Sequence, residues 1–131
     1  MTIISTLGPS GSDCYRAAKQ HNPEAEIRLF RCISDALDSF VEKNSDQVLI
    51  PVYNTREGES KEYFKLLEEL KTGYWIDNVV LPIHLSLGSV VDKNEIDTIE
   101  VIVGRGSVFN QCQDYISKHF PEATLMTVQD I

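Results

Sequence analysis

The sequence predicts an α/β fold with mainly parallel strands. Short runs rich in Val, Ile and Leu alternate along the 131 residues with stretches that carry apolar side chains at helical spacing. Turns rich in Gly, Pro, Asn and Ser separate the two kinds of segment. Strands that alternate with helices are joined by helical crossovers, so neighbouring strands of one sheet run in the same direction.

The first half of the chain is predicted to hold three strands and three helices. Asn22-Pro23 stops the first helix, Ser34 is expected to cap the second, and Ser60 to cap the third. Pro51 ends the third strand because it removes a hydrogen-bond donor from the ladder. The strands are expected at residues 3–7, 26–32 and 48–50, and the helices at 14–21, 34–41 and 60–71.

The second half begins with a break at Gly73. Residues 75–91 are rich in Val, Ile and Leu and are interrupted by Pro82 and Gly88, which is typical of an extended crossing between two lobes. A strand, a helix and a last strand follow at residues 98–103, 108–120 and 123–128. We therefore expect a first α/β lobe over residues 1–78, and a crossing strand with a second α/β lobe over residues 79–131.

Composition excludes several classes of partner. The formal net charge of −8 argues against nucleic acid and anionic membrane as binding partners. No apolar run approaches the roughly 20 residues of a membrane span, and the start of the chain lacks the basic and apolar regions of a secretory signal. The three cysteines show no CxxC spacing, which favours reduced thiols and a cytoplasmic location. No cluster has metal-ligand spacing and no cofactor motif is found, so neither is expected.

One stretch combines a strand with a polar loop. Val48-Leu-Ile reads as a short buried strand, and Tyr53, Asn54, Thr55 and Arg56 follow beyond its carboxyl end. Ligands of open α/β sheets bind beyond the carboxyl ends of the strands. A phenol, an amide, a hydroxyl and a guanidinium within four residues are suited to holding an oxygen-rich anion.

Four stretches together resemble one family. They are Thr6-Leu-Gly-Pro-Ser-Gly-Ser12 followed by Ala17-Ala18, then Ile50-Pro-Val-Tyr-Asn-Thr-Arg-Glu-Gly58, Val80-Leu-Pro-Ile-His-Leu85 and Gln111-Cys112. In their order and spacing they are similar to the motifs of the prephenate dehydratase catalytic domain. The resemblance covers nearly the whole chain, and it implies a two-lobed fold like that of the type II periplasmic binding proteins, with a ligand cleft between the lobes.

The chain also departs from the family's pattern. Tyr53 stands where the family has a glutamate, Thr55 replaces a serine, Asp13 stands at an aromatic position, and Arg105-Gly-Ser107 replaces a His-Pro-Gln turn. The family's closing Thr-Arg-Phe motif, with its essential threonine, has no counterpart before Ile131. We therefore expect an incomplete second lobe, whose exposed strand edges favour either a homodimer or a chain shortened from a longer parent.

The resemblance implies a lyase that acts on prephenate and forms phenylpyruvate by decarboxylative dehydration, within aromatic amino acid biosynthesis. Asn54, Thr55 and Gln111 would be its catalytic residues. The anionic aromatic-pathway substrate would be bound by Ser12, Arg56, Arg105 and Ser107. Ser12 and Ser107 lie at predicted helix amino termini after Gly-containing turns, where free N–H groups favour carboxylates.

Two alternatives stay open. Relatives in bacilysin-type antibiotic pathways are prephenate decarboxylases, which retain the ring hydroxyl and need no acid to expel it. A non-catalytic relative that only binds an aromatic acid would also have lost the usual motif residues. Tyr53 and the absent threonine favour the binding relative, whereas Asn54, Thr55 and Gln111 in matching places favour the lyase.

Overall fold

The computed structural model describes residues 1–129 of the chain, which divides into two compact units. Unit 1 comprises Met1–Tyr53 and Glu59–Ile83, and unit 2 comprises Asn54–Gly58 and His84–Ile131. The expected lobe boundary between residues 78 and 79 stays a prediction. Both units contain parallel strands joined by helices, so the predicted α/β fold with mainly parallel strands is confirmed.

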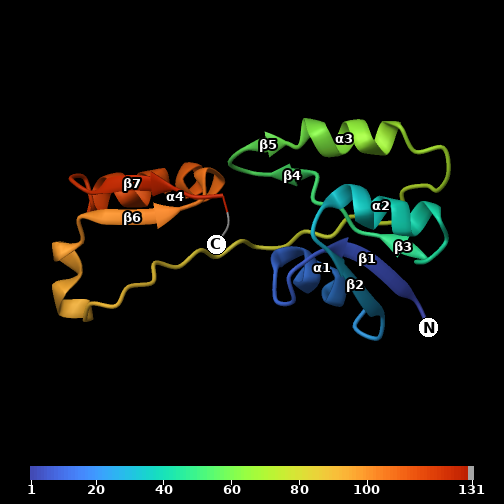
Figure 1. Ribbon diagram of the computed structural model, residues 1–131, viewed down its shortest axis with the longest axis horizontal. Coiled ribbons are helices and arrows are strands. Elements are labelled where there is room, and N and C mark those ends of the chain that lie inside the picture. The colour runs from blue at the N-terminus through green and yellow to red at the C-terminus, as the bar shows by residue number, and fades with distance from the viewer. Residues whose placement is uncertain (130–131) are drawn as a thin grey trace. The chain divides into compact units, whose positions relative to one another are not determined.

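Unit 1 is built on a parallel three-stranded sheet of order β2-β1-β3 (Figure 1). The strands are β1 (Ile3–Leu7), β2 (Glu26–Phe30) and β3 (Gln47–Val48). β1 is central, and its register sets Ile3 opposite Glu26 and Leu7 opposite Phe30. Because β1 is paired on both edges, Ile4, Ser5 and Thr6 are almost completely buried.

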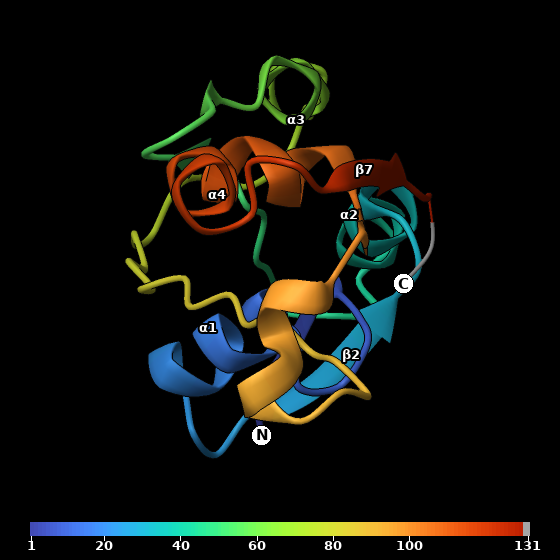
Figure 2. The ribbon, with the colours of Figure 1, turned by 90° about the vertical axis from the view of Figure 1, so that its left-hand side faces the viewer.

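Two helices cover this sheet from opposite sides. α1 (Asp13–His21) and α2 (Ile33–Val41) lie on the two sides of the strands in both views (Figures 1 and 2). The connection from β1 to β2 and the connection from β2 to β3 run in opposite directions across the sheet. Because both crossovers are right-handed, their helices lie on opposite faces. Alanines at the contacts, Ala18 and Ala36, are fully buried and let the helices approach the sheet closely.

Three details of this sheet and its helices correct the sequence-based predictions. The strand predicted at 26–32 ends at Phe30, because Cys32 is already the N-cap of α2. The predicted strand 48–50 is wrong in extent, because β3 ends at Val48, although the Leu49 N–H still donates to the Ser5 carbonyl at 2.9 Å. Ser34 does not cap α2, since the helix begins one residue earlier, at Ile33, with Cys32 at the N-cap. The Ser34 hydroxyl instead lies 3.3 Å from the Cys32 sulfur.

The segment after β3 forms a short two-stranded sheet and a surface helix. β4 (Tyr53–Asn54) pairs with β5 (Gly58–Glu59), and α3 (Lys61–Glu68) follows. Ser60 is at the N-cap of α3 as predicted, but its side chain makes no capping hydrogen bond. α3 buries none of its residues completely and ends three residues before the predicted Lys71.

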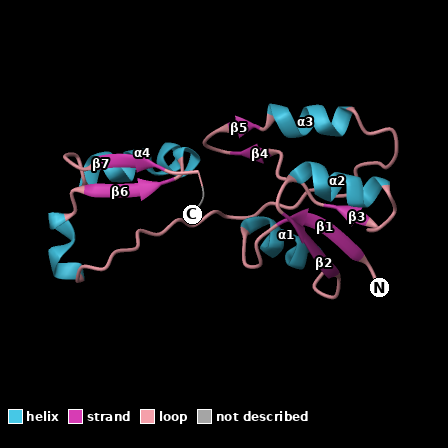
Figure 3. Ribbon diagram, in the orientation of Figure 1, coloured by secondary structure: helices cyan, strands magenta, loops and turns pink. Residues whose placement is uncertain are grey.

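Residues 69–92 contain no helix or strand, and Figure 3 shows them as one long loop. Unit 2 then comprises the 3₁₀ helix η1 (Lys93–Thr98), β6 (Val101–Gly104), α4 (Gly106–His119) and β7 (Thr124–Thr127). β6 and β7 are parallel, with Val101 opposite Thr124. The strand predicted at 98–103 therefore starts too early, because η1 takes up the residues as far as Thr98.

Burial in unit 2 is limited. Ile102 is 7% exposed and Phe120 is 8% exposed, whereas Val101, Val103, Leu125 and Met126 are each between 45% and 53% exposed. A two-stranded sheet with one helix covers too little of its apolar surface. None of the helices described between residues 1 and 129 has the length and apolar character of a membrane span.

Candidate functional site

The loop between β4 and β5 is folded around the Asn54 side chain. Its Oδ1 accepts hydrogen bonds from the backbone N–H groups of Arg56 at 2.8 Å and Glu57 at 3.4 Å. Asparagine commonly organises a turn in this way. Gly58 completes the turn with a φ of +81°, a conformation that glycine adopts at little cost. The carbonyl oxygen of Asn54 is thus used to shape its own loop.

The other end of the Asn54 amide contacts α4. Its Nδ2 donates to Gln111 Oε1 at 3.3 Å, and both side chains are half-buried. Residues that stand 57 positions apart and were each predicted from a separate motif therefore meet within unit 2. With its oxygen engaged, Gln111 presents its amide nitrogen as the group that is left to donate to a ligand.

Arg56 fastens the loop to the same helix. Its Nε donates to the Asn110 carbonyl at 3.2 Å, and its Nη2 lies 3.1 Å from Asp114 Oδ2. The guanidinium predicted to bind an anionic ligand is therefore paired with a carboxylate of the chain. Asp114 was not among the predicted site residues, although its place three residues after Gln111 on one helix put both on one face.

The amino terminus of α4 belongs to the same unit. Arg105 is the N-cap residue, and its carbonyl accepts from the N–H groups of Val108 at 3.0 Å and Phe109 at 3.1 Å. The Arg105 side chain is exposed and makes no capping hydrogen bond, and Ser107 is half-buried in the first turn. The first-turn N–H groups and the helix dipole favour an anion there. Gln111 lies five residues after Gly106, the first residue of α4, which is about 7.5 Å along the helix axis.

Two loop residues point to solvent. Tyr53, in the place of the family's glutamate, is 64% exposed, and Thr55 is exposed as well. Neither side chain is held by burial. An exposed threonine hydroxyl without an activating neighbour is a weak acid, so Thr55 is suited to hydrogen bonding rather than to proton donation.

Ser12 belongs to unit 1, where it caps α1. Its Oγ accepts from the Tyr15 N–H at 3.3 Å and donates to the Leu7 carbonyl at 3.3 Å. The predicted helix amino terminus at this Gly-containing turn is therefore formed, and its cap is the serine hydroxyl. The neighbouring Cys14 thiol has a raised pKa because it is desolvated by burial, which keeps it protonated and unreactive.

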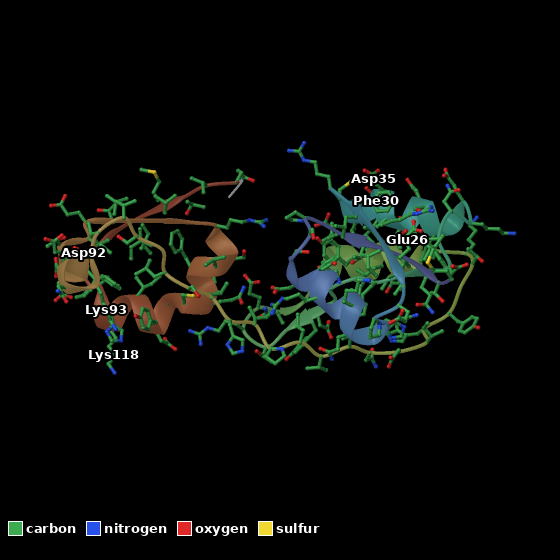
Figure 4. The ribbon with its side chains drawn as sticks, turned by 90° about the horizontal axis from the view of Figure 1, so that it is seen from below. Glu26, Phe30, Asp35, Asp92, Lys93 and Lys118 are labelled. Atoms are coloured by element: carbon green, nitrogen blue, oxygen red, sulfur yellow. The ribbon has the colours of Figure 1, made fainter. Side chains whose placement is uncertain are left out.

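A hollow of about 330 Å³ lies on unit 1 between β2 and α2. Phe30 and Asp35, labelled in Figure 4, line it from these two elements. Three carboxylates line it with Arg28, whose guanidinium already donates to Glu26 at 2.9 Å and to the Asn44 carbonyl at 2.6 Å. This lining repels an anion, so the hollow is a poor candidate for a carboxylate ligand. The carboxylates are Asp35, Asp38 and Glu42.

No group of three or more His, Cys, Asp or Glu side chains among residues 1–129 is arranged to hold a metal ion. The clearest set of polar side chains drawn from distant parts of the chain is therefore the loop at 54–58 with the face of α4 that carries Gln111. This set offers the Gln111 amide nitrogen, the Thr55 hydroxyl and the exposed Arg105 guanidinium, while the Arg56 guanidinium is paired with the Asp114 carboxylate. They can hold an oxygen-rich anion and offer no strong general acid.

Comparison with known proteins identifies the family. Residues 4–131 match the family model described as prephenate dehydratase. The chain is 32% identical over 126 residues to a bifunctional chorismate mutase/prephenate dehydratase of Buchnera aphidicola, covering 91% of this chain and 31% of the relative. It is 27% identical over 121 residues to a prephenate dehydratase of Lactococcus lactis, covering 92% of this chain and 42% of that protein.

A solved structure agrees with this assignment. The X-ray structure of prephenate dehydratase from Streptococcus mutans matches with a TM-score of 0.51 and 30% sequence identity, over 54% of this chain and 38% of that one. The chain thus spans between 31% and 42% of the length of these relatives. Since the family model matches almost every residue, the chain belongs to the prephenate dehydratase family.

Proposed function

We propose that this chain is a prephenate dehydratase-like lyase domain, which acts on prephenate and forms phenylpyruvate in aromatic amino acid biosynthesis. The observation that carries the proposal is the 3.3 Å hydrogen bond from Asn54 to Gln111. It joins the two motif residues that the family resemblance singles out, and it lies beside a helix amino terminus suited to a carboxylate.

The chemistry asks for a site that holds an anion. Prephenate carries two carboxylates and a ring hydroxyl. When the bond to the ring carboxylate breaks, carbon dioxide leaves, the electron pair enters the ring, and the hydroxyl departs as water once it takes up a proton. Aromatisation drives this step, so the protein mainly has to orient the substrate and assist the departing hydroxyl by hydrogen bonding.

The proposed roles follow from the contacts of unit 2. Gln111 donates to the substrate through its amide nitrogen and is itself held by Asn54. The first-turn N–H groups at Ser107 and the exposed Arg105 guanidinium pair with a carboxylate. Thr55 supplies a further hydroxyl, and Arg56 supports the loop that carries Asn54 and Thr55. Ser12 is retained as a substrate-binding residue through the helix terminus that it caps.

A second candidate is a non-catalytic relative that binds an aromatic acid. The observation that favours it is the pairing of Arg56 with Asp114, which neutralises a cation of the site, together with the exposed Tyr53 in place of a glutamate. The decarboxylase alternative shares the binding groups of the lyase and needs no acid at the ring hydroxyl. Product analysis separates these readings.

The proposal includes a cytoplasmic protein with a small anionic metabolite as partner and with two copies in contact. The free cysteines support the cytoplasmic location. The amino terminus of α4, with the exposed Arg105 beside it, supports the anionic partner. The exposed apolar strands of unit 2 support the third.

The test is incubation of the pure chain with prephenate, followed by ultraviolet absorbance and mass spectrometry of the products. Phenylpyruvate formed above the spontaneous rate, and lost at least tenfold in Gln111→Ala, is the expected result. A dihydro-hydroxyphenylpyruvate that keeps the hydroxyl would establish the decarboxylase. Absence of turnover, with stabilisation of the chain by prephenate in thermal-shift titration, would establish the binding relative. Ser117→Ala, an exposed position on the same helix, is the matched control.

A further inference from the structure

Arg56 attaches the loop between β4 and β5 to α4 at two points. Its Nε donates to the Asn110 carbonyl at 3.2 Å, and its Nη2 donates to Asp114 Oδ2 at 3.1 Å. Asn110 and Asp114 are four residues apart, so they follow one another along one face of the helix. The planar guanidinium therefore spans one helical turn, which fixes its direction better than a single ion pair between two flexible side chains.

The backbone of Arg56 takes part in the same arrangement. Its N–H donates to Asn54 Oδ1 at 2.8 Å, and Asn54 Nδ2 donates to Gln111 Oε1 at 3.3 Å. Gln111 and Asp114 are three residues apart on α4 and lie on one face of it. The contacts thus form a closed cycle, which runs from Asp114 through Arg56 and Asn54 to Gln111 and returns along the helix.

This contact cycle decides which atom of Gln111 is offered to a ligand. A backbone N–H can only donate, so the Asn54 oxygen faces the loop and its NH2 group faces α4. That NH2 group in turn takes the Gln111 oxygen, which leaves the Gln111 nitrogen to donate to a ligand. If the loop moved off α4, the Gln111 amide could turn, and an outward oxygen would repel an anion.

The charge of Asp114 is unfavourable for an anionic ligand. Asp114 lies three residues after Gln111, about 4.5 Å along the helix axis. Its side chain is 87% exposed, and its carboxylate also withdraws the Arg56 cation from ligand binding. By Coulomb's law alone, this carboxylate weakens the binding of prephenate. A contribution of Asp114 to the site therefore has to come from the position that it gives to Arg56.

We infer that Asp114 is a positioning residue of this site, which acts through Arg56 to hold the Gln111 amide with its nitrogen toward the ligand. The inference rests on the proposed function for the identity of the ligand, whereas the contact cycle is tested without one. Charge and position predict opposite results for Asp114→Asn. Loss of the repelling charge would strengthen prephenate binding, whereas loss of the position weakens binding and slows turnover.

The first experiment measures hydrogen exchange of the side-chain amides of the isotope-labelled full chain by NMR, without ligand. Asp114→Asn is expected to speed exchange of the Asn54 NH2 group at least threefold, because its hydrogen bond to Gln111 is loosened. Arg56→Lys keeps every charge but cannot donate to both acceptors on α4 as the guanidinium does, so the same increase is expected. Ser117→Ala, at an exposed position of α4, is the control. Exchange as slow as in the wild type in both variants would overturn the inference.

The second experiment compares turnover and binding of prephenate. Asp114→Asn is expected to lower kcat/KM for phenylpyruvate formation at least fivefold and to weaken prephenate binding in isothermal titration. Asp114→Glu keeps a carboxylate within reach of Arg56 and is expected to stay within twofold of the wild type. Circular dichroism establishes that the variants are folded.

The outcomes separate the inference from the proposed function. Tighter prephenate binding by Asp114→Asn would show that Asp114 acts by its charge alone, and it would overturn the inference. A wild-type chain that neither binds nor converts prephenate would contradict the proposed function. The exchange of the Asn54 amide would then still decide whether Asp114 holds Gln111 in place.

Discussion

Both units consist of parallel strands joined by helices, but they differ strongly in how far the apolar side chains of their strands are buried. In unit 1, β1 is paired on both edges and covered by helices on both faces, and Ile4 is 1% exposed. In unit 2, β6 has a single partner strand, and Val101 and Val103 remain about half exposed on it. The position of a strand in its sheet, rather than its sequence, therefore decides whether its apolar side chains form a core.

The candidate site lies in the less buried unit. Its loop is joined to α4 by polar contacts, Asn54 to Gln111 and Arg56 to Asp114. Polar contacts between half-exposed groups contribute little to stability but fix directions. Substitutions in unit 1 should therefore have large effects on stability, whereas substitutions in unit 2 should mainly affect ligand binding.

The largest difference in stability is expected between Ile4→Ala and Leu125→Ala. Ile4 packs with Ala18 and Ala25, so its truncation leaves a cavity and should destabilise the chain by about 2–5 kcal/mol. Leu125 is 45% exposed, and its truncation should remove less than about 1 kcal/mol. Urea unfolding followed by circular dichroism measures both. Comparable losses would mean that the two units are equally well packed.

Gly73→Ala should be next in size. Gly73 has a φ of +91°, and an added Cβ would lie 2.9 Å from the ring of Phe40. Backbone strain and overpacking together should destabilise unit 1 by about 1–3 kcal/mol. Gly88→Ala is the control, because an added Cβ there meets nothing within 4 Å and the φ is not positive. Thermal unfolding of the two variants checks the difference; a neutral Gly73→Ala would show that Phe40 moves freely.

Two serines at helix amino termini provide a smaller contrast. Ser12→Ala should destabilise by about 1 kcal/mol, because its hydroxyl accepts from the Tyr15 N–H. Ser60 occupies the same position on α3 without a side-chain hydrogen bond, so Ser60→Ala should be close to neutral. Chemical denaturation resolves such a difference. If both alanines were equally harmful, Ser60 would be capping α3 in solution.

The Arg56–Asp114 pair should contribute least to stability. Its side chains are 44% and 87% exposed, so Arg56→Gln or Asp114→Asn should change the free energy of unfolding by less than about 1 kcal/mol. If Arg56 acts through Asp114, the two substitutions should weaken prephenate binding by similar factors, and the double variant should be no worse than either single one. Isothermal titration of the three variants measures this. Additive losses would mean that Arg56 contacts the ligand directly.

Cys14 offers a test confined to alkaline pH. Burial raises the pKa of this thiol above its ordinary value, so the folded state favours the protonated form. The stabilisation is complete below the ordinary cysteine pKa and is lost as the pH rises through the raised value. The wild-type chain should therefore lose stability above about pH 8.5 more steeply than Cys14→Ala, as followed by urea unfolding. Parallel curves would mean that the thiol is accessible to solvent in the folded chain.

Patterns among neighbouring residues were sufficient to predict β1 and the start of α1. The limits of β1 at Ile3 and Leu7 are those expected from its apolar run, and α1 follows its Gly-Ser turn within one residue of the prediction. The four motifs were sufficient to predict the family, because their order and spacing along the chain are those of its members. These features depend on residues that are neighbours in the sequence or on a pattern inherited as a whole.

Tertiary structure decided what depends on distant partners. Leu49 and Ile50 have strand-like side chains, yet β3 ends at Val48, and no local signal announced that Arg56 would be paired with Asp114. Whether Val101 is buried depends on how many strands join β6. The sequence by itself determined the alternation of strands and helices and the chemical groups of the site. Only the folded chain decided which of these groups meet, because hydrogen bonds and burial join residues that stand tens of positions apart.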